Sequence, residues 1–214
     1  VTVYNDQQEP VFTYNSSSRF LIDARVSDDC KTVLVEALGQ EDGSFCTQQI
    51  TYDLSETEPQ YEALLHDHLS MDLDQIEDVW VSVSDKDISF TDKEGTLLGA
   101  FTYGDLYLRQ YSLDGAGFAA LLLNRYQAGS IGSLATVDET GEVIALLDVN
   151  QEVLDVSAAG NYLAVLMGNS LVIYNRELEE YSRLENTGYA NRVLMEADGS
   201  ALVIGGSSAF RYLP

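Results

Sequence analysis

The chain has 214 residues, of which 45% are hydrophobic and 21% charged, a composition typical of a folded domain and too apolar for a disordered chain. It carries 35 Asp and Glu against 11 Lys and Arg, a net charge of −24 at pH 7. Proteins that bind nucleic acid or anionic membranes carry a basic surface, so we exclude both as partners of this acidic chain. No apolar run approaches the roughly 20 residues that span a bilayer, so we expect no membrane contact by this segment.

A short pattern recurs along the chain: a β-branched run, an aromatic or apolar residue, and then usually Asn or Asp. The aromatic or apolar position returns about every 42 residues, and four-stranded propeller blades repeat every 40–50 residues or so. The marker residues are Tyr4, Tyr52, Phe90, Val137, Tyr174 and Tyr212. This period predicts an all-β fold, a β-propeller of about five four-stranded repeats.

A second marker, two strands joined by a tight turn, returns at a similar spacing. Its turns lie at residues 27–30, 112–115, 157–160 and 196–199, with a degenerate copy near residue 72. The strands that follow these turns are nearly continuous apolar runs, as expected for strands buried between neighbouring sheets. We therefore predict a single domain over residues 1–214, with repeat units at about 1–15, 16–64, 65–104, 105–150, 151–187 and 188–214.

The two ends of the chain leave the closure of the ring open. The first repeat contains only its predicted third and fourth strands, and the last repeat ends after its predicted third strand. Residues 11–14 could complete the sheet begun by residues 193–212, which would close a ring of five blades. Alternatively, the chain is an open part of a larger ring, and its exposed edge strands would then favour a homodimer.

Three segments of the chain resemble a known family: LYLRQYSLDGAGFAALL (106–122), VLDVSAAGNYLAVL (153–166) and GYANRVLM (188–195). They are similar to the C-terminal part of uncharacterised, membrane-anchored, WD-repeat-like β-propeller proteins of Gram-positive anaerobic bacteria, a domain of unknown function. The resemblance implies an extracytoplasmic or cell-surface protein whose N-terminal anchor lies outside this chain. Similarity to WD-repeat and quinoprotein-like propellers at the superfamily level implies binding and scaffolding more often than catalysis. We therefore predict a binding scaffold whose partner is a protein or a small anionic or glycan ligand.

The sequence contains little that points to catalysis. It has no Gly-x-Ser-x-Gly elbow, no phosphate-binding glycine loop and no His-Glu-x-x-His motif, so we predict no catalytic residue and no cofactor. The alternative is a quinoprotein-like or glycan-active propeller enzyme that uses carboxylates facing the central channel. Converging acids with perturbed pKa values would favour that alternative, and a flat or arginine-lined channel would oppose it.

Two residue pairs could carry metal or redox chemistry. In a strand, His66 and His68 would project from one face and form a weak metal site, whereas in an irregular connection they would simply be exposed. Cys30 and Cys46 lie at opposite ends of a predicted strand, about 20 Å apart at ~3.3 Å per residue. A disulfide needs Cα atoms within about 7 Å, so we predict two free thiols and no disulfide.

Arginines and tyrosines on loops and first strands are the candidate binding residues. Arginines at the channel either pair locally or take an anionic group, and Arg-Tyr pairs are enriched at binding hot spots. The loop at 124–133 holds such a pair, and the loops that enter first strands share its face. The candidates are Arg25, Arg109, Arg125, Tyr126, Tyr189 and Arg192.

Overall fold

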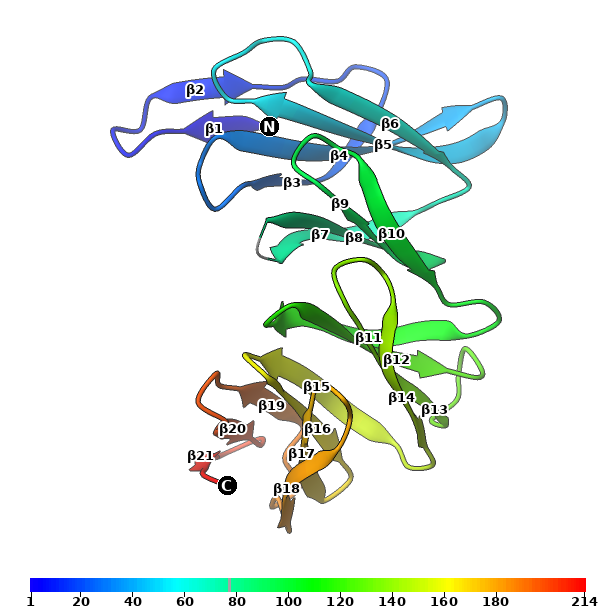
Figure 1. Ribbon diagram of the computed structural model, residues 1–214, viewed down its shortest axis with the longest axis vertical. Coiled ribbons are helices and arrows are strands. Elements are labelled where there is room, and N and C mark those ends of the chain that lie inside the picture. The colour runs from blue at the N-terminus through cyan, green and yellow to red at the C-terminus, as the bar shows by residue number, and fades with distance from the viewer. Residues whose placement is uncertain (77) are drawn as a thin grey trace. The chain divides into compact units, whose positions relative to one another are not determined.

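In the computed structural model, the described residues, 1–76 and 78–214, form β-strands and connections (Figure 1). They include no helix that is long and apolar enough to cross a membrane. The described residues divide into two compact units, Val1–Leu98 and Gly99–Pro214. The predicted all-β fold of four-stranded antiparallel repeats is confirmed.

The first unit contains a two-stranded sheet, a four-stranded sheet in the order β3-β4-β5-β6, and most of a sheet in the order β10-β9-β8-β7. The outer strand β10 crosses the boundary between the units. The strand bounds are β1 Thr2–Tyr4, β2 Pro10–Thr13, β3 Phe20–Val26, β4 Thr32–Glu41, β5 Ser44–Asp53, β6 Tyr61–His66, β7 Ser70–Ile76, β8 Val79–Ser84, β9 Asp87–Thr91 and β10 Leu97–Thr102.

The second unit contains two four-stranded sheets, β11-β12-β13-β14 and β15-β16-β17-β18, and a three-stranded sheet, β19-β20-β21. Strands that are consecutive in the chain pair antiparallel throughout these sheets. The strand bounds are β11 Tyr107–Gly115, β12 Phe118–Asn124, β13 Gly132–Val137, β14 Val143–Val149, β15 Val153–Ala159, β16 Tyr162–Met167, β17 Ser170–Asn175, β18 Glu180–Glu185, β19 Arg192–Met195, β20 Ala201–Ile204 and β21 Ala209–Tyr212.

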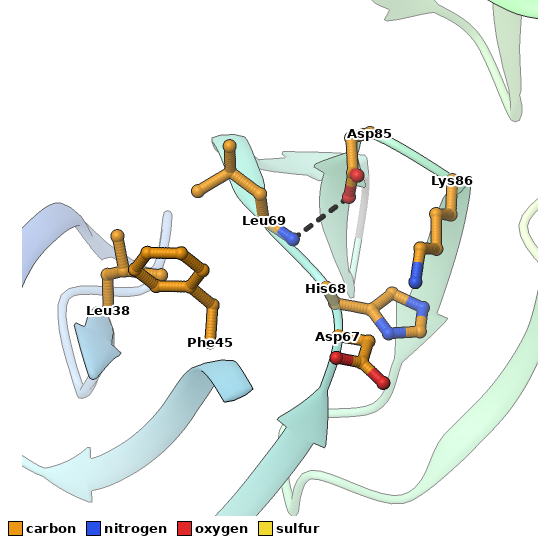
Figure 2. Close-up of a pocket in the computed structure, with 7 residues that line it drawn as sticks. All are labelled: Leu38, Phe45, Asp67, His68, Leu69, Asp85 and Lys86. Atoms are coloured by element: carbon orange, nitrogen blue, oxygen red, sulfur yellow. Dashed lines mark hydrogen bonds between the residues drawn. The ribbon is translucent and has the colours of Figure 1, made fainter. Parts of the chain in front are cut away.

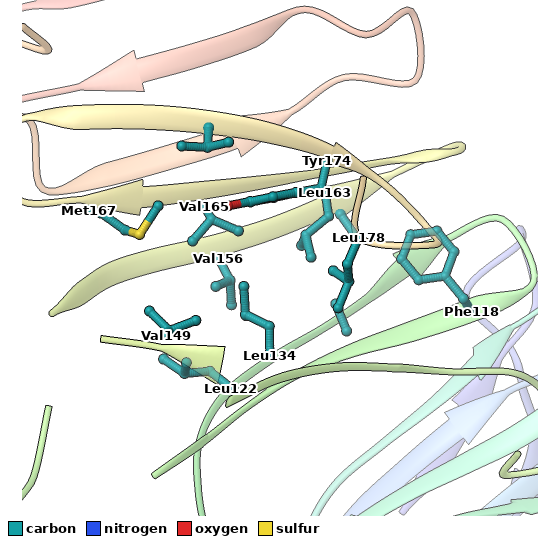
Figure 3. Packing of buried hydrophobic residues seen from close by; sticks show 13 residues of the cluster. Phe118, Leu122, Leu134, Val149, Val156, Leu163, Val165, Met167, Tyr174 and Leu178 are labelled. Carbon is teal, nitrogen blue, oxygen red and sulfur yellow. The ribbon is translucent and has the colours of Figure 1, made fainter. Parts of the chain in front are cut away.

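The second strand is the most deeply buried in three of the four-stranded sheets, and in the sheet β3–β6 the strands β4 and β5 are buried to the same extent. All seven residues of β12 are buried, whereas β14 and β18 are largely exposed outer strands. Side chains from β12 and β13 pack against those from β16 and β17, with Phe118, Leu134 and Leu163 among them (Figure 3). Burial on both faces explains why these strands are continuous apolar runs rather than alternating ones.

First strands of successive sheets in the second unit are joined by side-chain hydrogen bonds. Ser112 Oγ of β11 accepts the Ala158 N–H of β15 at 2.9 Å, and Ser157 Oγ of β15 accepts the Met195 N–H of β19 at 3.0 Å. The same kind of bond therefore recurs from one sheet to the next, as expected for a repeat protein.

Residues 11–14 form a hairpin with the first strand, and their pairing with the last sheet stays a prediction. β2 pairs with β1, with Thr2 opposite Thr13, and β19, β20 and β21 form a sheet of three. The hairpin is favoured locally, because the Asn5 side chain accepts the N–H groups of Gln7 and Glu9 and so closes a short turn. Phe12 then packs on the first four-stranded sheet, with its ring centroid 4.9 Å from that of Tyr52.

A buried carboxyl group links the two larger sheets of the first unit. Glu36 of β4 is fully buried. Its Oε1 accepts Gln49 Nε2 of β5 at 2.8 Å and Ser82 Oγ of β8 at 2.7 Å, and its Oε2 accepts the Ser70 hydroxyl of β7. Burial raises the pKa of Glu36, and the three hydrogen bonds oppose this shift only in part.

The raised pKa predicts how the Glu36→Gln variant behaves with pH. The folded state binds the Glu36 proton more tightly than the unfolded state does, so proton binding stabilises the folded wild type. This contribution to the free energy of unfolding is complete below the ordinary pKa of about 4.3 and is lost as the pH rises through the raised pKa. We expect the free energy of unfolding of E36Q, relative to wild type, to increase with pH by up to about 1.4 kcal/mol per unit over that window. Urea unfolding at several pH values measures it.

The Glu36→Ala variant is the control, because it leaves Gln49, Ser70 and Ser82 without their shared acceptor. We expect it to be less stable than E36Q by about 2–4 kcal/mol at every pH, since both variants lack the titrating group. A difference between E36Q and wild type that does not change with pH would contradict the account.

Candidate functional site

The first unit carries an open cavity of about 490 Å³ at one end of its sheets (Figure 2). Three connections form it: the tip of the β4–β5 hairpin, the β6–β7 connection and the β8–β9 turn. Antiparallel order places the β4–β5 and β8–β9 turns and the β6–β7 connection at the same end of their sheets. The lining residues are Leu38, Phe45, Asp67, His68, Leu69, Asp85 and Lys86.

The apolar side of the cavity comes from the β4–β5 hairpin and from Leu69. Asp42 and Gly43 both have positive φ, 49° and 86°, which gives a tight two-residue turn between two ten-residue strands. Phe45 follows the turn and is 65% exposed, and Leu69 is 44% exposed. We name these two side chains, together with Leu38, the apolar wall.

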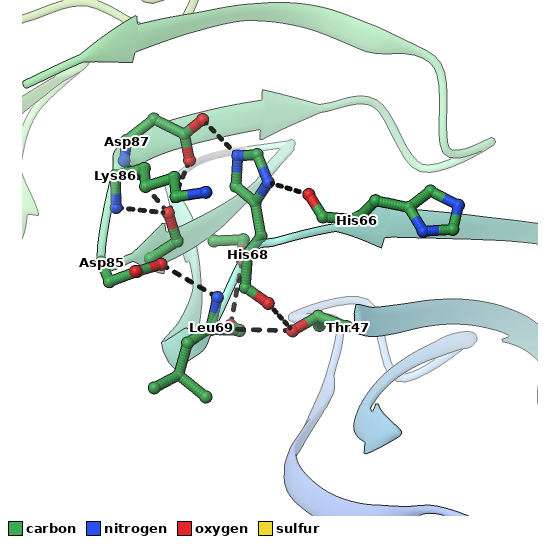
Figure 4. A network of polar contacts seen from close by, with 10 residues as sticks. Thr47, His66, His68, Leu69, Asp85, Lys86 and Asp87 are labelled. Carbon is green, nitrogen blue, oxygen red and sulfur yellow. Dashed lines mark hydrogen bonds and ion pairs between the residues drawn. The ribbon is translucent and has the colours of Figure 1, made fainter. Parts of the chain in front are cut away.

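The β6–β7 connection is held in place by bonds from three directions. The Asp67 N–H donates to the Phe45 carbonyl at 3.0 Å, and Thr47 Oγ1 donates to the His68 carbonyl at 2.9 Å. The Leu69 N–H donates to Asp85 Oδ1 at 2.9 Å (Figure 4). The connection is therefore hydrogen-bonded both to the β4–β5 hairpin and to the β8–β9 turn, which line the cavity with it.

His68 is bonded at both ring nitrogens. Nδ1 lies 3.0 Å from the His66 carbonyl, and Nε2 lies 2.8 Å from Asp87 Oδ2. Because both partners are acceptors, the ring satisfies both bonds only as the imidazolium. Burial disfavours this charge, but the bonds to His66 and Asp87 and the carboxylate charge outweigh it and raise the pKa of His68.

Lys86 differs from most cations of this chain. Among the described residues, every Lys and Arg except Lys86 and Arg109 forms an ion pair with Asp or Glu. Lys86 lies between two aspartates in the sequence, yet Asp85 bonds the Leu69 N–H and Asp87 bonds Ser84 and His68. An unpaired cation thus stands at the cavity of a strongly acidic protein.

Three of the four predicted arginines form ion pairs within their own unit. Arg25 Nε lies 3.0 Å from Asp74 Oδ1, and the hydrogen bond with Asp74 raises the pKa of Arg25. Arg192 Nη1 lies 3.3 Å from Asp155 Oδ1, and Arg125 Nη2 lies 3.7 Å from Asp148 Oδ1. Asp155 also accepts the Val193 N–H at 2.9 Å, so the Arg192 pair is part of a local structural network.

Arg109 lines a smaller cavity of about 50 Å³ in the second unit, beside Asn124 and Glu152. Tyr126 and Tyr189 lie on connections of the same unit and are 71% and 84% exposed. Their loops leave the same end of their sheets, because one joins a second to a third strand and the other enters a first strand. Their role in binding stays a prediction.

The histidines and cysteines occupy separate sites. β6 ends at His66, and Asp67 has φ of 56°, which breaks the strand alternation. The His66 ring is directed away from the His68 ring (Figure 4), and within the described part of the chain no group of His, Cys, Asp and Glu is arranged to hold a metal ion. Cys30 is exposed, whereas Cys46 is buried against Arg19, whose Nη1 lies 3.2 Å from the Cys46 sulfur.

Sequence reasoning missed the apolar wall and Lys86. Phe45 and Leu69 are ordinary strand and loop residues in the sequence, and only the three-dimensional arrangement brings them together. A usable signal was present, because Phe45 lies two residues after the Asp42-Gly43 turn, near the tip of a hairpin. The unpaired state of Lys86 carried no signal, since the sequence places Asp on both sides of it.

Comparisons with known proteins show the fold. No protein-family model and no curated protein matches the chain. Among solved structures, the chain is similar to the Dos1 propeller, with a TM-score of 0.55 and 11% identity over 98% of this chain and 58% of that one. It is also similar to Kluyveromyces lactis Hsv2p, with a TM-score of 0.53 and 12% identity over 90% of this chain and 74% of that one.

A third similar structure is BBS1N, solved in complex with ARL6DN, with a TM-score of 0.50 and 12% identity over 99% of this chain and 82% of that one. Identities this low show the fold alone. The chain has a β-propeller fold.

The raised pKa of His68 predicts a pH dependence of stability. The proton binds more tightly in the folded state, so the charged ring stabilises the fold below the ordinary pKa of about 6.5, and this contribution is lost as the pH rises through the raised value. Allowing for partial exposure, we expect wild type to lose about 0.5–1 kcal/mol relative to His68→Gln between pH 6 and pH 8.

NMR titration of the His68 ring measures the pKa directly. Asp87→Asn removes the carboxylate charge, so we expect the His68 midpoint to fall in that variant. A midpoint that is the same in wild type and D87N would show that Asp87 does not hold the proton.

Proposed function

We propose that this protein is a non-catalytic scaffold that binds a protein partner over the apolar wall. The observation that carries the proposal is an open cavity of about 490 Å³ flanked by two exposed apolar side chains, Phe45 and Leu69. Exposed apolar groups around a hollow mark interaction sites on soluble proteins, and aromatic anchors dominate binding energy at such sites. The propeller fold supports protein partners in general, since the similar BBS1N was solved in complex with ARL6DN.

The enzyme alternative has no support among the described residues. Two carboxylates on first strands are used locally: Asp23 Oδ1 accepts the Ala24 N–H at 2.7 Å, and Asp155 accepts the Val193 N–H and pairs with Arg192. At the cavity, Asp85 is likewise bonded to a backbone N–H. These contacts are structural and do not converge on a position where a substrate atom could react.

Crosslinking in the cells that produce the protein tests the scaffold proposal. A photoreactive phenylalanine analogue in place of Phe45 is expected to give a discrete crosslinked partner, which mass spectrometry then identifies. The control position is Tyr4, which is 60% exposed on the β1–β2 hairpin and does not line the cavity. With the purified partner, we expect Phe45→Ala to weaken binding at least about tenfold and Tyr4→Ala to change it less than about twofold.

Equal crosslinking from both positions, or an unchanged affinity in F45A, would contradict the proposal.

We also propose that the protein works outside the cytoplasm or at the cell surface, anchored by an N-terminal segment outside this chain. The acidic balance, with only three lysines among 214 residues, and the resemblance to membrane-anchored propellers support this location. Protease treatment of intact cells is expected to remove the protein, and its survival until the cells are lysed would contradict the proposal.

We propose in addition that the protein forms a homodimer through edge strands. The outer edge of β21 has no partner strand among the described strands of its sheet, and unpaired edges template pairing with another chain.

A further inference from the structure

The charges around the apolar wall indicate which protein segment it selects. Lys86 is exposed, lines the cavity and has no ion-pair partner among the described residues. In a chain with 35 acidic and 11 basic residues, an unpaired cation is the exception. A free ammonium beside an apolar surface attracts a carboxylate from a binding partner.

The neighbouring acids are engaged in ways that keep Lys86 free. Asp85 accepts the Leu69 N–H at 2.9 Å, and its own N–H donates to the Leu69 carbonyl at 3.1 Å. Asp87 accepts Ser84 Oγ at 2.7 Å through Oδ1 and faces His68 Nε2 through Oδ2. Both aspartates that flank Lys86 in the sequence therefore bond to residues at the cavity and form no ion pair with the Lys86 ammonium.

Asp67 is the remaining acid at the cavity. In Figure 2 the ring of His68 is drawn between Asp67 and Lys86, and no ion pair joins these two side chains. Within the described part of the chain, no hydrogen bond or ion pair engages the Asp67 carboxylate. It is therefore available to accept an N–H from the backbone of a bound segment. The cavity thus offers an apolar wall, one cation and one acceptor.

We propose that the apolar wall and Lys86 together bind a segment of a protein partner that carries an aromatic or aliphatic side chain next to Asp or Glu. The proposal rests on the scaffold function above and adds the chemistry of the partner. The apolar side chain packs between Phe45 and Leu69, which are 65% and 44% exposed in the free protein. The carboxylate pairs with Lys86.

A displayed library of random peptides tests this proposal with five proteins: wild type, Phe45→Ala, Lys86→Glu, and the controls Tyr4→Ala and Lys31→Glu. Lys31 lies in the turn before β4, is 77% exposed and does not line the cavity. All four changes are on exposed side chains, so the variants are expected to fold. Circular dichroism of each variant checks this.

We expect wild type and both controls to enrich peptides with an apolar residue beside Asp or Glu. We expect F45A to lose the enrichment and K86E to replace Asp or Glu by Lys or Arg at the same position. For the best acidic peptide, the Kd is expected to rise at least about tenfold in K86E and less than about twofold in K31E.

The other outcomes separate the two proposals. Enrichment that depends on Phe45 without favouring Asp or Glu is one such result, and enrichment that favours Asp or Glu equally in wild type and K86E is another. Either result overturns the selection of an acidic residue and leaves the scaffold function standing. Absence of any enrichment that depends on Phe45 overturns both.

Discussion

Burial of strands between neighbouring sheets is the interaction on which the rest of this structure depends. All side chains of β12 are buried, and they would be exposed to water if no further sheet covered them. Burial of apolar surface stabilises the fold by roughly 25 cal/mol per Å². A single four-stranded sheet therefore cannot stand alone. Stacking within each unit follows from this constraint, and turns and connections are left at the ends of the sheets, where the cavities lie.

The sheets are joined in two different ways. In the second unit, a cluster of buried apolar side chains joins the sheets β11–β14 and β15–β18, and side-chain hydrogen bonds such as that between Ser112 and Ala158 link their first strands. In the first unit, Glu36 places a carboxyl group between two sheets and collects three donors around it. A buried polar group of this kind costs free energy if any partner is lost, so it ties β4 to β7 and β8 in a single arrangement. Those strands lead into the connections that build the cavity.

The sequence predicted the repeats well because their signals are local. Period-two alternation, continuous apolar runs and turn residues such as Gly95 and Gly141, both at positive φ, each depend on a few neighbouring residues. Pairing between distant segments has no such signal. The sequence allows residues 11–14 to pair with the last sheet, and no short-range pattern tests this, whereas the N-terminal hairpin is favoured locally by the Asn5 turn and by the contact of Phe12 with Tyr52.

The candidate site was predicted less well than the fold. Arg25 and Arg192 were proposed as binding residues, with local pairing as the alternative, and the structure shows them paired with Asp74 and Asp155. Which acid meets which base depends on the stacking of sheets, and so it could not be read from the chain. The unpaired state of Lys86 has the same origin, since hydrogen bonds to Leu69 and His68 hold its neighbours Asp85 and Asp87.

Hydrogen exchange with and without a bound partner segment tests the central claim most directly, because it reports the binding surface without a mutation. The account predicts that the segment slows amide exchange at residues 38–47, 67–70 and 85–87, where the three connections meet, and leaves residues 124–132 and 186–191 unchanged. Protection at the Tyr126 and Tyr189 loops, with none at the β4–β5 hairpin, would place the binding surface in the second unit and contradict the account.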